Sequence, residues 1–314
     1  MAVSRLTLVL VVASCALLGA ARATTASSGG LKVLVAGSCA QPNLVTAIQA
    51  QPGIGSVTAF DTSAGTPTAA QFASQDLVVD TGDECNGGYH DPTTYGNRLA
   101  DYVDHGGVVL QVAYDNWNKH GTYPKGRFAS GGYPPLDLGP NLNSPTHLGQ
   151  VLKPHSPLVQ GLGTFATGYN TTTPLAAGAQ LLVEWTDGRN GVAVKGRVVA
   201  TSASAYDSTA YADLARLARN TAEYFNAVPT TKITKARVDS SVRTAEFRFK
   251  AIGPFSSGFQ CELKKPRARS TFTACHVHKK YRGLQPGRYT FEVAAVGPGG
   301  PDPTPAKKRF RITP

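Results

Sequence analysis

The chain has 314 residues, of which 41% are hydrophobic, and its 31 Lys and Arg against 20 Asp and Glu give a net charge of +11. After an apolar stretch near residue 1, no segment stays apolar long enough to cross a bilayer, which excludes a protein with several membrane spans. The length exceeds the roughly 100 to 200 residues usual for one domain, so we expect two domains.

The beginning of the chain is typical of an export signal. Arg5 precedes an apolar run at residues 6–18, and Ala21 and Ala23 form an Ala-x-Ala cleavage site. We therefore expect residues 1–23 to be a signal peptide and the protein to be secreted or exposed at a cell surface. The alternative is a lipoprotein anchored at Cys15, but the residues after Cys15 stay apolar where a lipoprotein usually turns polar.

Cleavage after residue 23 would leave four cysteines, at positions Cys39, Cys85, Cys261 and Cys275. An even number of cysteines in an exported chain indicates disulfides. The wide gap in the middle favours pairing Cys39 with Cys85 and Cys261 with Cys275, out of three connectivities. Metal ligation is the weaker alternative, because no Cys-x-x-Cys spacing is present.

Short β-branched runs alternate with longer amphipathic stretches in the first two thirds of the chain. In chain order, strands are predicted at residues 31–37, 56–60, 75–80 and 108–112, and helices at residues 43–51, 69–74 and 91–105. Strands buried on both faces and separated by helices favour a parallel sheet with crossover connections. We therefore predict a doubly wound, flavodoxin-like α/β domain over residues 31–227.

The rest of this domain has a less regular pattern. Residues 121–161 are rich in Pro, Gly and Asn, which predicts a long irregular insertion. Residues 179–201 predict antiparallel strands with a turn at Asp187 and Gly188, and residues 211–225 predict a closing helix.

From residue 230 the helical periodicity disappears. Residues 243–250, 258–263 and 289–296 alternate with period two and are bounded by Gly and Pro, which predicts a C-terminal all-β, Ig-like sandwich over residues 230–314. The basic charge is concentrated here. Residues 229–314 hold 18 Lys and Arg against 5 Asp and Glu, a net +13, whereas residues 1–228 carry a net −2.

Residues 31–227 resemble the class I glutamine-amidotransferase-like fold, in its trehalose-utilisation-like branch. The resemblance is carried by the strand at residues 31–37, by "DLVVD" at 76–80, by "LADYVDHGGVVLQV" at 99–112 and by "HSPLVQGL" at 155–162. In that family a Cys nucleophile follows the strand that corresponds to residues 108–112, and a His and a Glu precede the last helix. Residues 112–116 contain no Cys or Ser, and residues 201–207 contain no His or Glu, so no catalytic residue is expected from the resemblance.

Residues 230–314 resemble the Ig-like or fibronectin-type-III-like modules that are appended to exported bacterial proteins. The resemblance is carried by "FQCELKK" at 259–265, by "FTACHVHKKYRGLQPGRYTFEVAAV" at 272–296 and by "GGPDPTPA" at 299–306. It implies that Cys261 and Cys275 sit on paired strands.

Polar and aromatic side chains gather where the predicted parallel strands end, which is the edge at which open α/β sheets bind ligands. The candidate ligand-binding residues are Ser38, Asp83, Glu84, Tyr114, Asp115, Asn116, Trp117 and His120. Aromatic rings together with amides and carboxylates suit a sugar or another polyol. The alternative is that Tyr114 and Trp117 only anchor the insertion by packing.

Metal binding and a thiol nucleophile are less strongly indicated by the sequence than ligand binding. A divalent cation could be held by the acidic cluster Asp80, Asp83, Glu84, His90 and Asp91, but its spacing matches no known metal loop, so neither a metal nor a cofactor is expected. His276 and His278 would lie on one face of a strand, where exposed histidines are commoner than chelating ones. A free thiol at Cys39 or Cys85 would be an alternative nucleophile, which a disulfide between them would abolish.

Dense cations attract polyanions in a salt-dependent manner. The candidate polyanion-binding residues are Lys264, Lys265, Arg267, Arg269, Lys279, Lys280 and Arg282, with a further basic cluster at residues 307–311. A solvated charged face is the alternative interpretation of these residues.

The sequence thus favours an exported bacterial protein without catalytic activity. Its α/β domain would bind a small ligand, a glycan or a wall polymer, and its basic domain would adhere to anionic extracellular or wall material. One alternative is a secreted hydrolase of carbohydrate or amide bonds that uses Asp83, Glu84, Asp115 or His120 as acid and base. Another is an interaction module in which the α/β domain is only a scaffold.

Overall fold

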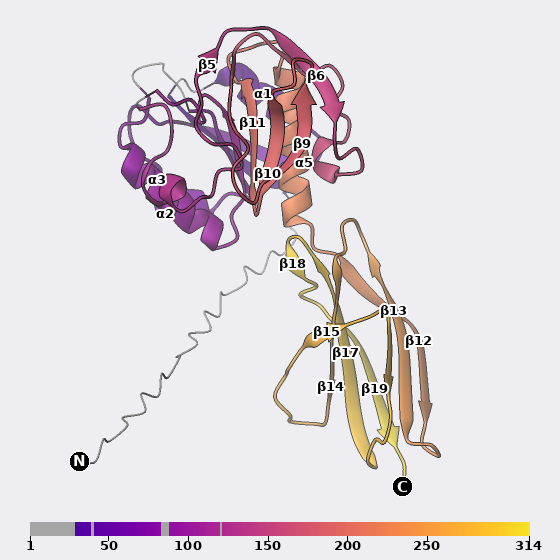
Figure 1. Cartoon of the computed structure of the whole chain (residues 1–314). Helices are drawn as coiled ribbons and strands as arrows, with labels where there is room; N and C mark the ends of the chain where they lie inside the picture. Colours follow the sequence, from indigo (N-terminus) through magenta and orange to yellow (C-terminus); the bar gives the residue numbers. More distant parts are fainter. Residues whose placement is uncertain (1–28, 39–40, 83–87, 120) are drawn as a thin grey trace, which may run out of the picture.

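The structure is a computed structural model that describes residues 29–38, 41–82, 88–119 and 121–314. Residues 31–227 form an α/β region. Residues 230–314 follow the last helix and form a β region (Figure 1). The expected signal peptide and the expected Cys39–Cys85 pair lie outside the described residues. Within the described part of the chain, no helix is both long and apolar enough to span a membrane.

The centre of the α/β region is a parallel sheet. Its strands are β1 (Leu31–Gly37), β2 (Ile54–Asp61), β3 (Leu77–Asp80), β4 (Val109–Ala113) and β11 (Val198–Ser204), in the order β2-β1-β3-β4-β11. Strands β3, β4 and β11 are buried along their whole length. The mainly apolar runs of β3 and β4 predict this burial, whereas β11 is buried although it contains Thr201, Ser202 and Ser204. The order corresponds to the 2-1-3-4-5 arrangement of flavodoxin-like sheets, which is consistent with the predicted fold class.

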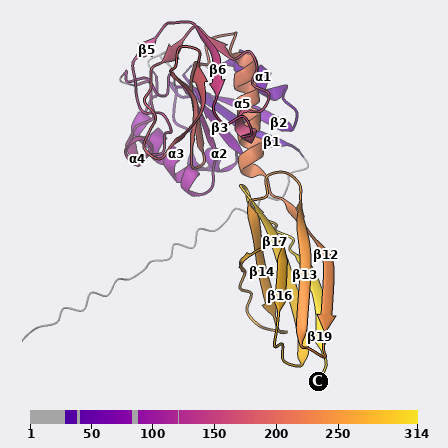
Figure 2. The same ribbon diagram turned by 45° about the vertical axis from the view of Figure 1, so that its right-hand side comes forward.

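Helices cover both faces of this sheet. The helices α1 (Pro42–Gln49) and α5 (Tyr211–Asn226) pack on one face, and α2 (Ala69–Ala73) and α3 (Pro92–Asp104) pack on the other (Figure 2). Helix α3 begins directly after Asp91, whose carboxylate accepts hydrogen bonds from the backbone N–H groups of Thr93 and Thr94 at 3.1 and 2.9 Å. This N-cap satisfies amides that the first turn leaves unpaired.

The prediction of an irregular insertion at residues 121–161 holds only in part. The segment contains the helix α4 (Gly126–Ser130), the strands β5 (Asn141–Leu142) and β6 (Thr146–Val151) and the single-turn helix η2 (Pro157–Val159). Strand β6 pairs with β9 (Gln180–Trp185), which continues the sheet through β10 (Asn190–Lys195). Gly149 interrupts the pattern of β6 for a packing reason, because a Cβ there would lie 2.5 Å from the carbonyl carbon of Trp185.

The antiparallel strands predicted within residues 179–201 are present as β9, β10 and β11, and β11 also joins the parallel strands through β4. Two shorter strands, β7 (Ala166–Thr167) and β8 (Asn170–Thr171), pair with β6 and β5. The predicted closing helix is α5.

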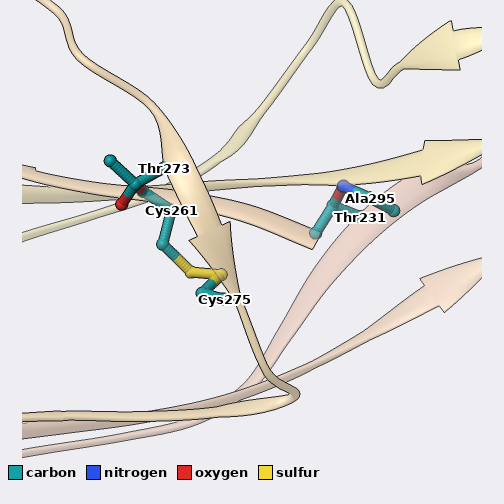
Figure 3. The surroundings of a disulfide bond; sticks show 5 residues. All are labelled: Thr231, Cys261, Thr273, Cys275 and Ala295. Carbon is teal, nitrogen blue, oxygen red and sulfur yellow. A yellow bond between two sulfur atoms is a disulfide. The ribbon is translucent and has the colours of Figure 1, made fainter. Parts of the chain in front are cut away.

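The β region contains two antiparallel sheets. The first sheet contains β12 (Thr230–Asp239), β13 (Thr244–Ile252) and β16 (His278–Tyr281). The second sheet contains, in order, β15 (Thr273–Cys275), β14 (Gly258–Lys264), β17 (Gly287–Gly297) and β18 (Gly300–Pro301). Strand β19 (Ala306–Ile312) also pairs with β17. Their inner side chains form one core, in which the rings of Phe247 and Phe291 stack with centroids 4.0 Å apart. The Oγ1 of Thr231 accepts a hydrogen bond from the N–H of Ala295 at 2.7 Å, which links the two sheets (Figure 3).

A disulfide between Cys261 and Cys275 joins the paired strands β14 and β15, with an S–S distance of 2.01 Å (Figure 3). This confirms the predicted pairing of the last two cysteines. The expectation for the two histidines is wrong, however. Strand β15 ends at Cys275 and β16 begins at His278 in the other sheet, so His276 and His278 do not share a strand face.

One arginine connects the two regions. Arg197 follows β10 and donates hydrogen bonds to the carbonyl oxygens of Phe225 at 2.9 Å and of Pro298 at 2.8 Å, and its guanidinium lies 5.3 Å from the centroid of the Phe225 ring. The N–H of Gly299 also donates to the carbonyl oxygen of Ala227 at 3.0 Å. The end of α5 is therefore held against the turn between β17 and β18.

We expect Arg197→Met to loosen this junction and to lower the free energy of unfolding by about 2 kcal/mol. The variant loses the hydrogen bonds to Phe225 and Pro298 and a longer one to the carbonyl oxygen of Gly107 at 3.4 Å, while the side-chain length is kept. The measurement is limited proteolysis between residues 226 and 230 together with urea unfolding. Cleavage at the rate of the unaltered protein would show that Arg197 does not hold the junction.

Candidate functional site

Three polar residues lie at the carboxyl ends of adjacent parallel strands. Ser38 follows β1, Asp80 is the last residue of β3, and Asp115 lies two residues after β4. All three are buried, with exposed fractions of 0%, 0% and 1%. Because β3 lies between β1 and β4, the fold brings Ser38 and Asp115 to the same edge, as the sequence predicts.

Asp80 and Asp115 share a tyrosine hydroxyl. The Oη of Tyr89 lies 2.6 Å from Oδ1 of Asp80 and 2.5 Å from Oδ1 of Asp115, and Tyr95 donates to the same oxygen of Asp80 at 2.9 Å. A hydroxyl has only one proton to donate, so both short contacts of Tyr89 are satisfied only when one carboxyl group is protonated. The two acids and the two tyrosines therefore form one buried network. Asp80 and Asp115 are called here the acid pair.

The protonation of the acid pair follows from its burial. Burial raises the pKa of Asp80 to about 6, against hydrogen bonds from Tyr89, Asp115 and Tyr95 that lower it. Burial, followed by the charge of Asp80, raises the pKa of Asp115 well above its usual range. Burial and the neighbouring carboxylates also raise the pKa of Tyr89 well above its usual range, so Tyr89 stays a hydrogen-bond donor. Burial therefore keeps a proton on the pair at pH values where an exposed pair of aspartates would release it.

A glycine makes room for the pair. A Cβ at Gly82 would lie 1.9 Å from Oδ1 of Asp115 and 2.4 Å from the carbonyl oxygen of Thr122. The N–H of Tyr114 donates to the carbonyl oxygen of Gly82 at 3.2 Å, which fixes the turn after β4 against the end of β3. No larger residue fits between these backbones.

The other predicted residues of this turn have different surroundings. The amide of Asn116 donates to the carbonyl oxygen of Thr201 at 3.3 Å and accepts from the hydroxyl of Thr171 at 2.5 Å, so it ties the turn to β8 and β11. The rings of Tyr114 and Trp117 lie 5.3 Å apart, and the ammonium group of Lys119 lies 5.0 Å from the ring of Trp117. Asp83, Glu84 and His120 lie outside the described residues.

A pocket of about 320 Å³ lies beside Asp115, between the sheet and the insertion that covers it. Its walls combine apolar side chains with polar ones. The lining residues include Gln111, Asp115, Tyr123, Leu136, Asp137 and Lys195. Gln111 points into this space from the middle of β4. Its side chain is only 2% exposed, and its Oε1 has no hydrogen-bond partner among the described residues.

The sequence analysis missed Gln111 and Lys195. Gln111 is the one polar residue within the apolar run of β4, and a polar side chain inside a buried strand is the signal that could have marked it. Lys195 ends β10, and its place in the pocket depends on antiparallel pairing that only the full sheet defines.

The chemistry of the described residues is limited. The described part of the chain holds no group of three or more His, Cys, Asp or Glu arranged for a metal ion. The residues directly after β4 are Tyr114 and Asp115, and those after β11 are Ala205 and Tyr206, so neither turn supplies a thiol, a hydroxymethyl group or an imidazole. The arrangement offers hydrogen bonds, a buried proton and apolar walls.

Comparisons with known proteins give remote matches. No protein-family profile and no curated protein sequence matches the chain. Among solved structures, a cytoplasmic protein from Salmonella typhimurium is similar over 62% of this chain and 98% of its own, with 10% identity and a TM-score of 0.46. A protein described as ThuA-like from Bacteroides uniformis is similar over 65% of this chain and 95% of its own, with 12% identity and a TM-score of 0.44.

The β region has its own matches. The fibronectin type-III domain of a human protein is similar over 28% of this chain and 87% of its own, with 16% identity and a TM-score of 0.21. All three TM-scores are low, so no activity or residue role is carried over from these proteins to this chain.

Proposed function

We propose that this chain is an exported binding protein with two domains, residues 31–227 and residues 230–314. The first binds a small polyol or sugar in the pocket beside β4 without transforming it. The second is an Ig-like or fibronectin-type-III-like module that adheres to anionic extracellular or wall material. The observation that carries the first part is the unpaired Oε1 of Gln111 in the pocket wall.

An unpaired buried carbonyl is costly, by about 1 to 3 kcal/mol, unless something donates to it. A ligand hydroxyl would remove that cost. The pocket volume of about 320 Å³ lies at the small end of ligand sites, which favours a ligand of monosaccharide size.

The rest of the pocket wall suits the same ligand. Lys195 and Asp137 offer a donor and an acceptor for further hydroxyls, while Tyr123 and Leu136 offer apolar surface to ring C–H groups. The turns after β4 and β11 present tyrosines and a hydrogen-bonded aspartate, which suits binding rather than covalent catalysis.

Gln111→Leu is expected to abolish the proposed hydrogen bond between a ligand hydroxyl and Oε1 of Gln111, with nearly the same side-chain volume. Affinity for the bound sugar or polyol should fall about tenfold, whereas stability without ligand should stay equal or rise, because no buried amide is left unpaired. Calorimetric titration of a panel of monosaccharides and polyols measures the first effect, and thermal unfolding measures the second. Equal affinities in both proteins would place the ligand elsewhere.

Export is supported by the apolar beginning of the chain and by the Cys261–Cys275 disulfide, since disulfides persist in oxidising compartments. Adhesion is supported by the net charge of +13 in residues 229–314.

The second candidate function is a hydrolase, because a proton held between Asp80 and Asp115 beside a pocket is what a general acid requires. Incubation with reporter glycosides and amides distinguishes the two functions. Turnover that disappears in Asp115→Asn would favour the hydrolase.

A further inference from the structure

The outward side of the first sheet of the β region carries six exposed cations, and this surface is called here the basic face. Its members are Lys232, Lys235 and Arg237 on β12, Arg248 and Lys250 on β13, and Lys280 on β16. The side chains that alternate with them, among them Phe247 and Phe249, point into the core between the sheets.

The strand register places like charges directly opposite each other. Lys232 pairs with Lys250, and Lys235 pairs with Arg248. Cross-strand pairs of equal charge destabilise a sheet unless an anion lies between them. An anion bound between these pairs would reduce the repulsion within each pair, whereas an isolated surface lysine has no such repulsion to relieve.

A bulge maintains this arrangement. The register of β12 shifts between Ile233 and Lys235, so that Thr234 is an extra residue. With strict alternation, Lys235 would point into the core and Ala236 would point outward. The bulge restores Lys235 and Arg237 to the outer side, in line with Lys232.

Few carboxylates oppose these cations. Glu246 lies opposite Arg237 in the register and contacts His278 at 3.0 Å and Lys280 at 3.8 Å. Asp239 accepts hydrogen bonds from Ser241 in the turn at the end of β12. On the second sheet Arg288 likewise lies opposite Arg311, but two carboxylates lie among its cations. Lys264 contacts Glu262 at 2.5 Å and Glu292 at 3.2 Å, and Lys307 contacts Glu292 at 3.3 Å. The predicted polyanion residue Lys264 is therefore largely neutralised, and the greater excess of positive charge lies on the basic face.

The form of the face restricts the class of polyanion. The aromatic side chains of these three strands, Phe247, Phe249 and Tyr281, belong to the core, so no ring is presented for stacking with bases. The cations lie on the outer face of a three-stranded sheet and not on a helix of the kind that enters a nucleic-acid groove. Outward cations lie roughly 7 Å apart along a strand and about 5 Å apart across strands, which suits an extended chain with regularly spaced anions.

We propose that the basic face binds a linear anionic polysaccharide through its sulfate, phosphate or carboxylate groups. This proposal rests on the adhesive role proposed for the second domain. It assigns that role to the outward cations of β12, β13 and β16, of which only Lys280 belongs to the clusters that are continuous in sequence.

The test compares two triple variants of the full chain that remove the same charge. Lys235→Gln/Arg248→Gln/Lys250→Gln alters the basic face, and Arg288→Gln/Arg309→Gln/Arg311→Gln alters the exposed arginines of β17 and β19. Dextran sulfate is the probe, titrated at several salt concentrations, with uncharged dextran as the control polymer. We expect the first variant to bind about tenfold or more weakly and with a smaller salt dependence, and the second to bind within about twofold of the unaltered protein.

Three results would overturn the proposal. Equal losses in both variants would show that net charge, not the face, determines binding. Tighter binding of a single-stranded oligonucleotide or of anionic lipid vesicles than of dextran sulfate, at equal charge, would assign the face to another class of partner. If the unaltered protein does not bind dextran sulfate, the adhesive role itself is wrong. Thermal unfolding of both variants verifies that each is folded.

Discussion

Asp80→Asn is expected to stabilise the α/β region at pH 8 by roughly 3 kcal/mol, which corresponds to the rise in the pKa of this carboxyl from 3.8 to about 6. The amide that replaces the carboxyl keeps an oxygen that can accept from Tyr89 and Tyr95, and its NH₂ group can donate to Asp115. The substitution therefore removes a buried charge and leaves the hydrogen bonds in place.

The sign of the pH dependence follows from proton binding. Between pH 3.8 and about 6 the folded protein keeps a proton on the acid pair that the unfolded chain releases, so stability falls as the pH rises through this interval. The variant should lack the part of this fall that Asp80 causes, whereas burial still raises the pKa of Asp115 in it. Its stability should be close to that of the unaltered protein near pH 4 and higher above pH 6.

Urea unfolding followed by tryptophan fluorescence measures this effect in the α/β region alone, because both tryptophans, Trp117 and Trp185, lie there. Asp213→Asn is the matched control. Asp213 is also buried, but its carboxylate accepts from the N–H of Gly163 at 3.1 Å and belongs to no acid pair. A gain of equal size in the control, or a loss of stability in Asp80→Asn at pH 8, would contradict the account of the acid pair.

Removal of the disulfide by Cys261→Ala/Cys275→Ala is expected to destabilise the β region by about 3 kcal/mol. The bond closes a loop with a sequence separation of 14 residues, and losing such a cross-link increases the entropy of the unfolded chain by that order. The packed pair Phe247 and Phe291 remains, so the sheets should still form.

Hydrogen exchange resolved by peptide measures this loss in β14 and β17. Exchange there should be on the order of a hundredfold faster in the double variant, while exchange in β3 and β4 should not change. Unchanged exchange in β14 would mean that the disulfide is not a source of stability, and a change of equal size in β4 would mean that the two regions unfold together.

The parallel sheet could be predicted from the sequence because burial on both faces favours mainly apolar runs, and β1, β3 and β4 have such runs with one polar residue each. Strand β6 could not, because it joins the sheet through the close approach of Gly149 to Trp185 and has little apolar pattern of its own. The local sequence pattern predicts a strand poorly where tertiary contacts determine whether that strand forms.

The site was predictable in part for the same reason. Asp115 could be placed at the sheet edge because it follows a buried strand, but its partnership with Asp80 and two tyrosines needs the order of β3 and β4 and the start of α3. Of the basic face, only Lys280 was predicted. Its other cations alternate with core residues over two strands and a bulge, whereas a search along the chain finds contiguous clusters such as residues 264–269.

The central claim is that the pocket beside β4 binds a small polyol or sugar and leaves it unchanged. One measurement tests this claim most directly: calorimetric titration of the unaltered protein and of Gln111→Leu with a panel of monosaccharides and polyols, followed by chromatography of the recovered ligand. We expect binding by the unaltered protein, about tenfold weaker binding by the variant, and unaltered ligand after incubation. Chemically altered ligand, or equal binding by both proteins, would contradict it.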